Sequence, residues 1–146
     1  MLNYLFLALQ AAVCASTIGT PHASIATPDA PHAIGPYVQA KVAGDTLYLS
    51  GQLPLDPKTG ELVGEDIGKQ TERVLLNLQA ILTAQGMTLD DAVMANVFLT
   101  DLGDFEDMNE IYAGFFKTPP ARATVEVKGL AKGARIEISL IAVRRH

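Results

Sequence analysis

The chain has 146 residues, enough for one ordinary globular domain, with 49% apolar and 18% charged residues. Its net charge of −5, without a cluster of Lys and Arg inside the domain, argues against nucleic-acid binding, where neutralising phosphate charge dominates affinity. The first charged side chain is that of Asp29, so the opening segment, unlike the rest of the chain, contains no Asp, Glu, Lys or Arg.

Residues 1–23 resemble a secretory signal peptide. Met1 to Ala15 is an apolar run followed by small residues, and small residues around Ala15 and Ala23 give two candidate cleavage points. The run is shorter than the roughly 20 apolar residues that span a bilayer. We expect an exported protein, periplasmic or secreted, without stable membrane association after processing. Because the segment lacks Lys and Arg, a misassigned start codon or an apolar tail on a cytoplasmic protein stays as the alternative.

Cleavage at either point would remove Cys14, the single cysteine of the chain. Disulfides and thiol catalysis are therefore not expected in the remaining domain, residues 24–146.

The first predicted secondary structure is a β-hairpin between Tyr37 and Leu53. Apolar residues alternate along two runs, and Ala43-Gly44-Asp45 lies between them as the turn. Two prolines and a glycine within residues 54–60 then predict a chain reversal.

Two helices and three strands follow. Helical spacing predicts a helix over residues 66–85, with Glu65 or Asp66 as its cap and Gly86 after its end. Residues 93–100 predict an interior strand, and residues 122–127 and 135–143 predict two more. Between the strands at residues 93–100 and 122–127, Asp104 is expected to cap a second helix that ends at Pro119-Pro120. Its expected buried stripe is Phe105, Met108, Tyr112, Phe115 and Phe116.

The resulting order, β-β-α-β-α-β-β, predicts a two-layer α+β domain with both helices on one face of the sheet. Apolar residues occur on the other strand face as well, and two helices cannot cover both. We therefore expect sheet-to-sheet burial in an oligomer.

Few residue patterns point to chemistry. The three histidines are scattered and no cysteine cluster exists, so no metal site is expected. Arg122, Thr124 and Glu126 share one strand face, and Glu137 lies among three isoleucines. A buried charge is costly without a partner, so either Glu137 pairs with Arg122 or Arg135 across neighbouring strands or it has a catalytic role.

Several motifs in order resemble the Rid family of reactive-intermediate imine deaminases, from about Ser24 to Arg145. They are Ile25–Pro31, Ile34–Gln39, Ser50–Pro54, Asp56–Gly60, Pro119–Val127, Ile136–Ile138 and Ile141–Val143. The resemblance implies a chorismate-mutase-like α+β subunit with a mixed sheet, assembled as a homotrimer with three sites between subunits.

The resemblance also implies a reaction: hydrolysis of 2-imino acids, such as 2-iminobutanoate and 2-iminopropanoate, to 2-keto acids and ammonia without cofactor or metal. The residue types suit it. A guanidinium holds a planar carboxylate by two parallel hydrogen bonds, which favours Arg122 as the anchor. A carboxylate can orient a water molecule and accept its proton, which favours Glu137 as the general base.

The same resemblance assigns substrate-binding roles to Tyr37, Ser50, Gly51, Asn109 and Thr124. Thr124 would act through its backbone carbonyl, and Gly51 by letting the backbone approach the ligand. Without the resemblance, Tyr37 is a half-buried aromatic residue, Gly51 a β-bulge and Asn109 a solvated helix residue.

The sequence departs from the family pattern in three places. The departure at Thr124 is expected to have little functional effect, and the other two concern the cleft entrance and substrate preference. Thr124 stands where many members have Cys, Ser139 where some have a carboxylate, and the segment between Phe116 and Arg122 is short. The alternative function is a non-catalytic, trimeric, stress-related protein that binds small molecules. A ribonuclease activity, as reported for some relatives, fits poorly with the charge of −5.

Overall fold

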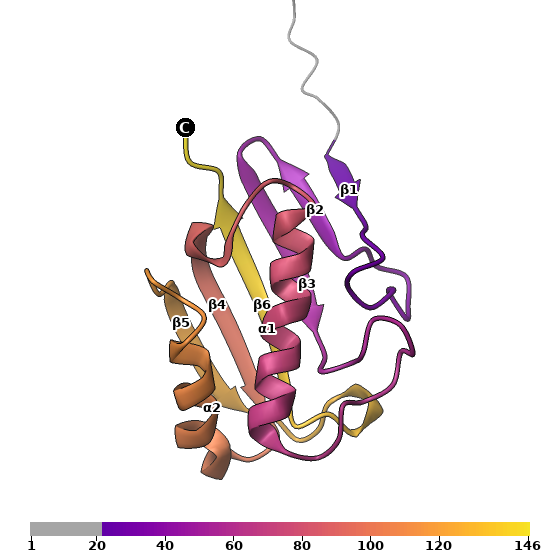
Figure 1. Cartoon of the computed structure of the whole chain (residues 1–146), viewed down its shortest axis with the longest axis vertical. Coiled ribbons are helices and arrows are strands. Elements are labelled where there is room, and N and C mark those ends of the chain that lie inside the picture. Colours follow the sequence, from indigo (N-terminus) through magenta and orange to yellow (C-terminus); the bar gives the residue numbers. More distant parts are fainter. Residues whose placement is uncertain (1–21) are drawn as a thin grey trace, which may run out of the picture.

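The computed structural model describes residues 22–146. Six strands form one mixed sheet in the order β1-β2-β3-β6-β4-β5, and both helices lie across the same face (Figure 1). The two-layer α+β prediction is therefore confirmed. The elements are β1 (Ala23–Ile25), β2 (Ala40–Ala43), β3 (Thr46–Gln52), α1 (Ile67–Thr83), β4 (Ala92–Leu99), α2 (Phe105–Ala113), β5 (Ala121–Glu126) and β6 (Ile136–Val143).

The N-terminal half of the sheet contains one strand more than predicted. β2 and β3 form the expected hairpin around Gly44, whose φ of 60° suits glycine. The additional strand β1 pairs with β2, from Ala23 opposite Val42 to Ile25 opposite Ala40. Three residues are too few to show a period, which is why the sequence pattern missed β1.

Most of the predicted signal segment lies outside the described residues. Within residues 22–146, neither helix is long and apolar enough to cross a membrane.

Helix α1 follows its sequence prediction. The Asp66 carboxylate caps it by accepting a hydrogen bond from the Lys69 backbone N–H at 2.8 Å, and Gly86 follows its end with a φ of 65°. Its buried face packs on β6 and β3, and Val74, Leu75, Leu78 and Ile81 are fully buried there.

Helix α2 corrects three predictions, which concern its end, its buried stripe and its cap. It ends at Ala113, so Phe115 lies beyond it, and Phe105 is 37% exposed instead of belonging to the buried stripe. Asp104 stands at the N-cap position, but its side chain makes no capping hydrogen bond and instead accepts one from Arg135 at 2.7 Å. A carboxylate that an arginine can reach has a stronger partner than a backbone N–H.

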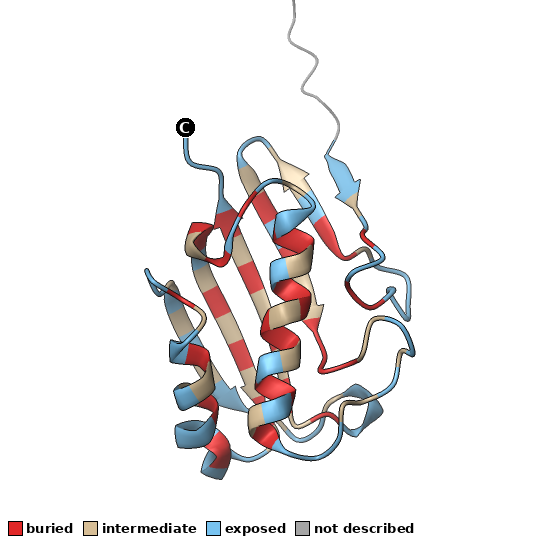
Figure 2. Cartoon of the chain, in the orientation of Figure 1, coloured by how far each residue is buried: buried red, intermediate tan, exposed pale blue. Residues whose placement is uncertain are grey.

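The sheet has two different faces. Along β6, Ile136, Ile138, Leu140 and Ala142 are buried beneath the helices, and the residues between them are only partly buried, as the alternating bands of Figure 2 show. β4 lies between β6 and β5, as expected of an interior strand. Helices cover one face only, so the positions of side chains on the two faces decide which residues can share a site.

Candidate functional site

Arg122 and Glu137 lie on opposite faces of the sheet. Arg122 on β5 is in register with Ala95 of β4, a fully buried residue of the helix-covered face. Glu137 on β6 is in register with Phe98, which belongs to the other face. Neither ion pair that the sequence suggested for Glu137 forms among the described residues. Arg122 does not reach Glu137, because β4 lies between their strands. Arg135, directly before β6, binds Asp104 instead.

The Arg122 guanidinium rests against aromatic rings of α2. Its Cζ lies 4.7 Å from the centroid of the Tyr112 ring and 5.7 Å from that of Phe105. Within residues 22–146, no carboxylate lies at salt-bridge distance from this guanidinium. Arg122 is thus an oriented cation that retains its capacity to bind an anion.

A cavity of about 450 Å³ opens beside Arg122. Asn109 and Arg122, both assigned to the site in the sequence analysis, contribute its amide and its cation. The other lining residues are Tyr112, Ala113, Phe116, Pro119 and Pro120. The cavity therefore suits a ligand with an anionic end and an apolar body.

Two buried hydroxyl groups lie near this cavity without hydrogen-bond partners among the described residues. They belong to Thr124, two residues from Arg122 on the same strand face, and to Tyr112. Burial raises the pKa of Tyr112 to about 12, against a smaller opposing effect of Arg122, so its hydroxyl stays protonated. Thr124 does not line the cavity, and Tyr112 was missed as a lining residue, although the spacing from Asn109 puts both on one helix face.

The short segment before Arg122 is tied to the turn that precedes β4. Asp90 Oδ1 accepts hydrogen bonds from the backbone N–H groups of Lys117 at 2.8 Å and Thr118 at 3.0 Å. Pro119 and Pro120, which line the Arg122 cavity, follow directly. Sequence reasoning missed this anchor because the partners are far apart along the chain.

A second cavity of about 450 Å³ contains Glu137. Three of the residues assigned to the site in the sequence analysis, Tyr37, Ser50 and Gly51, lie together around it. Ile34, Leu53 and Ala131 complete the lining. Ser50 and Gly51 lie where the register of β3 against β6 shifts, so the β-bulge expected as the structural explanation for Gly51 is also present.

Burial raises the pKa of the Glu137 carboxyl above its usual value. No ion pair compensates its charge within the described part of the chain. An uncompensated carboxylate of raised pKa in a cavity is a suitable proton acceptor. In contrast, residues 22–146 contain no cluster of His, Cys, Asp or Glu that could hold a metal ion.

Comparisons with known proteins identify the family of the chain. The sequence model of the family described as "Endoribonuclease L-PSP" matches residues 27–144. A conserved Rid-family protein of unknown function, YyfA from Yersinia pestis, is 48% identical, with 84% of this chain and 99% of that chain covered and a TM-score of 0.82. The chain belongs to the Rid family.

Two further relatives have more specific names. A protein of Salmonella typhimurium named 2-iminobutanoate/2-iminopropanoate deaminase is 48% identical over 126 residues, which cover 84% of this chain and 98% of that protein. The E. coli protein TdcF, solved with bound serine, is 42% identical, with 84% and 99% of the two chains covered and a TM-score of 0.81.

Proposed function

We propose that this Rid protein hydrolyses reactive 2-imino acids, such as 2-iminobutanoate and 2-iminopropanoate, to 2-keto acids and ammonia. The observation that carries the proposal is Arg122, an oriented guanidinium without an acidic partner among the described residues, at a cavity with otherwise largely apolar walls. The similarity to a relative named for this activity supports the same reaction.

The proposed site needs more than one copy of the chain. Arg122 and Glu137 occupy separate cavities on opposite faces, so they cannot act on one small ligand within one subunit. We propose a homotrimer in which the Arg122 cavity of one subunit faces the Glu137 cavity of the next. The helix-free face supports this assembly, because Tyr48 and Val125 expose apolar surface there.

In the proposed reaction, Arg122 binds the substrate carboxylate through two parallel hydrogen bonds. Glu137 orients a water molecule and accepts its proton while the oxygen attacks the imine carbon and the C=N π pair moves to nitrogen. A carbinolamine results. Glu137 passes both water protons in turn to the nitrogen. The first completes the amino group of the carbinolamine, and the second comes from its hydroxyl group as that oxygen forms the C=O bond and the C–N bond breaks, so that ammonia and the 2-keto acid leave. Each turnover consumes one imino acid and one water molecule.

The remaining predicted site residues would bind and enclose the substrate. Tyr37 lines the Glu137 cavity and Asn109 lines the Arg122 cavity. Ser50 and Gly51 would present backbone groups to the ligand from the bulge of β3. Thr124 would direct its backbone carbonyl at the attacking water.

Competition with semicarbazide tests the reaction. A threonine dehydratase releases 2-iminobutanoate, and this protein should reduce the semicarbazone formed in its presence. Arg122→Ala should abolish the reduction, whereas Arg144→Ala, at an exposed arginine near the C-terminus, should leave it unchanged. Unchanged trapping at high concentrations of the wild-type protein would contradict the proposal. Binding of 2-oxobutanoate together with unchanged trapping would indicate the alternative, a non-catalytic binding protein.

We also propose that residues 1–23 are a cleaved signal peptide and that residues 24–146 form the working domain. The family match over residues 27–144 supports the domain boundary. The intact mass of the protein from fractionated cells tests this. A start at Ser16 or Ser24 in the exported fraction is expected, and a start at Met1 in the cytoplasm would contradict it.

A further inference from the structure

We propose that Gln39 is a positioning residue that holds the loop of residues 26–38 against the Glu137 cavity. The inference deepens the proposed function and rests on it, because it concerns the wall of the same site. Gln39 itself does not line the Glu137 cavity, so it would act through the loop.

The side-chain amide of Gln39 is buried, with the residue 3% exposed, and bonded at both ends. Its Oε1 accepts a hydrogen bond from the Thr27 backbone N–H at 2.7 Å. Its Nε2 donates to the backbone carbonyls of Thr27 at 3.0 Å, Ala30 at 3.2 Å and Pro31 at 2.9 Å. A buried amide with all of these partners is costly to replace, because their polar groups would lose their bonds.

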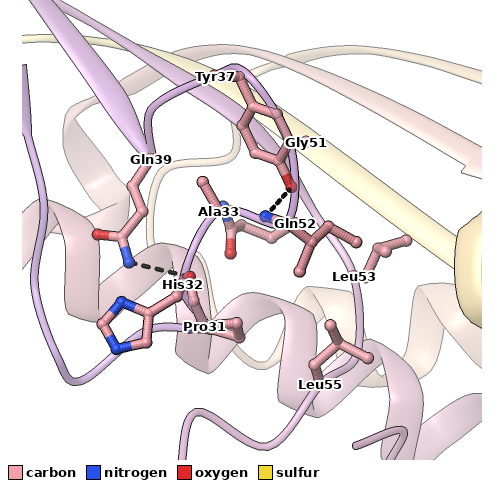
Figure 3. A pocket seen from close by; sticks show the side chains of 10 residues that line it. Pro31, His32, Ala33, Tyr37, Gln39, Gly51, Gln52, Leu53 and Leu55 are labelled. Atoms are coloured by element: carbon pink, nitrogen blue, oxygen red, sulfur yellow. Dashed lines mark hydrogen bonds between the residues drawn. The ribbon is translucent and has the colours of Figure 1, made fainter. Parts of the chain in front are cut away.

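The loop has few other means of holding its shape. Residues 26–38 contain no strand or helix, so no regular ladder of backbone hydrogen bonds fixes them. In the part of the loop next to Gln39, the Tyr37 hydroxyl accepts a hydrogen bond from the Ile34 backbone N–H at 3.2 Å (Figure 3). Ile34 and Tyr37 are the two loop residues that line the Glu137 cavity. The position of this wall therefore depends on the anchor at Gln39.

The backbone of Gln39 contacts the opposite wall of the same cavity. Its carbonyl accepts a hydrogen bond from the Ser50 backbone N–H at 3.0 Å, and Ser50 Oγ donates to the Val38 carbonyl at 2.6 Å. Gln39 thus joins the loop to the bulge that carries Ser50 and Gly51.

The space between the loop and β3 is small. A cavity of about 20 Å³, lined by residues that include Gln39, Gln52 and Tyr37, lies there (Figure 3). This volume is about that of one water molecule, so the loop has little room to move inward. The Gln39 hydrogen bonds oppose movement outward, and the two together fix the Tyr37 wall.

The substitution Gln39→Glu tests the inference, because it keeps the size of the side chain and replaces the donating amide. The carboxylate would face three carbonyl oxygens that need a donor. We expect KM for 2-iminobutanoate to rise about tenfold, the scale of one lost hydrogen-bonded contact, with kcat within about twofold of wild type. Hydrogen exchange at residues 27–37 should become faster.

Gln70→Glu is the matched control. Gln70 is also a buried glutamine, 0% exposed, whose Nε2 donates to the Gly64 carbonyl at 2.6 Å and whose Oε1 accepts from the Arg135 backbone N–H at 2.8 Å. It lines neither of the two 450 Å³ cavities. The control should lose thermal stability yet keep the wild-type KM and the wild-type exchange at residues 27–37.

A wild-type KM for Gln39→Glu, or an equal rise for Gln70→Glu, would overturn the positioning role while leaving the proposed reaction intact. If the wild-type protein hydrolyses no imine, the proposed function fails, and hydrogen exchange alone tests the role of Gln39. Faster exchange at residues 27–37 in Gln39→Glu, but not in Gln70→Glu, supports that role. Equal exchange in the two variants overturns it. Should Gln39→Glu not fold, Gln39→Met, uncharged and of similar length, is measured with the same expected results.

Discussion

The Glu137 side chain occupies the space that a β-carbon on Gly51 would need. A Cβ built on Gly51 lies 2.8 Å from Glu137 Cδ and 3.0 Å from Cγ, and overlaps Oε1. Gly51 does not have a positive φ, so its backbone conformation is open to other residues. A larger residue at position 51 would therefore force the Glu137 side chain to move, and glycine lets β3 pass beside the carboxylate.

Gly51→Ala is expected to displace the Glu137 carboxylate and to lower kcat by about 10²-fold, the cost of misplacing a catalytic group by about 1 Å. The coupled semicarbazone assay measures the loss, and the melting temperature checks that the protein stays folded. Gly129→Ala is the matched control, because its new β-carbon would meet no atom within 4 Å. Equal activities of the two variants would show that Glu137 needs no fixed position.

The sequence predicted the elements whose side chains show a clear period, and failed where other contacts decided the structure. The 17 residues of α1 carry an apolar stripe, and β2 and β3 alternate around a glycine turn. In contrast, β1 exists because a neighbouring strand offers a partner. The Asp104 carboxylate accepts a hydrogen bond from Arg135 instead of capping α2, because Arg135 reaches it from a distant part of the chain.

The candidate site shows the same division. Residue types and family motifs predicted which side chains matter, and alternation predicted that Arg122 and Thr124 share a face. Alternation does not say which face of the sheet that is. The strand order, with β4 between β5 and β6, depends on pairing across the sheet, so the suggested Arg122–Glu137 ion pair was wrong. The suggested Arg135–Glu137 pair was wrong because Arg135 binds Asp104. Gln39 and Asp90 act on distant backbone groups, which leave no local pattern in the sequence.

The raised pKa of Glu137 predicts a pH dependence of activity. The base must be ionised, so kcat should fall as pH decreases through the raised pKa, and this acid limb should lie above the ordinary value of 4.5. Glu137→Gln should lower kcat by about 10² to 10⁴ and remove the limb. A pH profile of kcat for both proteins measures this, and an unchanged limb in the variant would assign it to another group.

The same shift predicts an opposite effect on stability. Burial favours the protonated carboxyl, so the folded protein binds this proton more tightly than the unfolded chain, and the ionised carboxylate reduces stability above the raised pKa. Glu137→Gln should therefore melt at a higher temperature than wild type at neutral pH, and the difference should vanish below about pH 4.5. A lower melting temperature at neutral pH would mean that the carboxylate has a stabilising partner.

Arg122→Lys should retain a positive charge and lose the paired hydrogen bonds to the substrate carboxylate. We expect kcat/KM to fall by about 10²-fold, since a charge-assisted hydrogen bond contributes about 1.5–3 kcal/mol. Arg145→Lys is a suitable control, because Arg145 pairs with Asp91 and neither residue lines the cavity. Wild-type kinetics for Arg122→Lys would show that only the charge matters, and lost folding would show that Arg122 is structural.

Asp90 is predicted to set the entrance of the Arg122 cavity, because its carboxylate holds the segment that leads to Pro119 and Pro120. Asp90→Ala removes the acceptor for the N–H groups of Lys117 and Thr118, at a cost of about 1 kcal/mol for each lost hydrogen bond. KM should rise several-fold while kcat changes little. Asp90→Asn keeps an oxygen that can accept both bonds, so it should restore the wild-type KM. Steady-state kinetics and thermal unfolding of both variants measure these effects. If the two variants have the same KM, the short segment keeps its position without Asp90, and the shape of the cavity entrance must come from the prolines themselves.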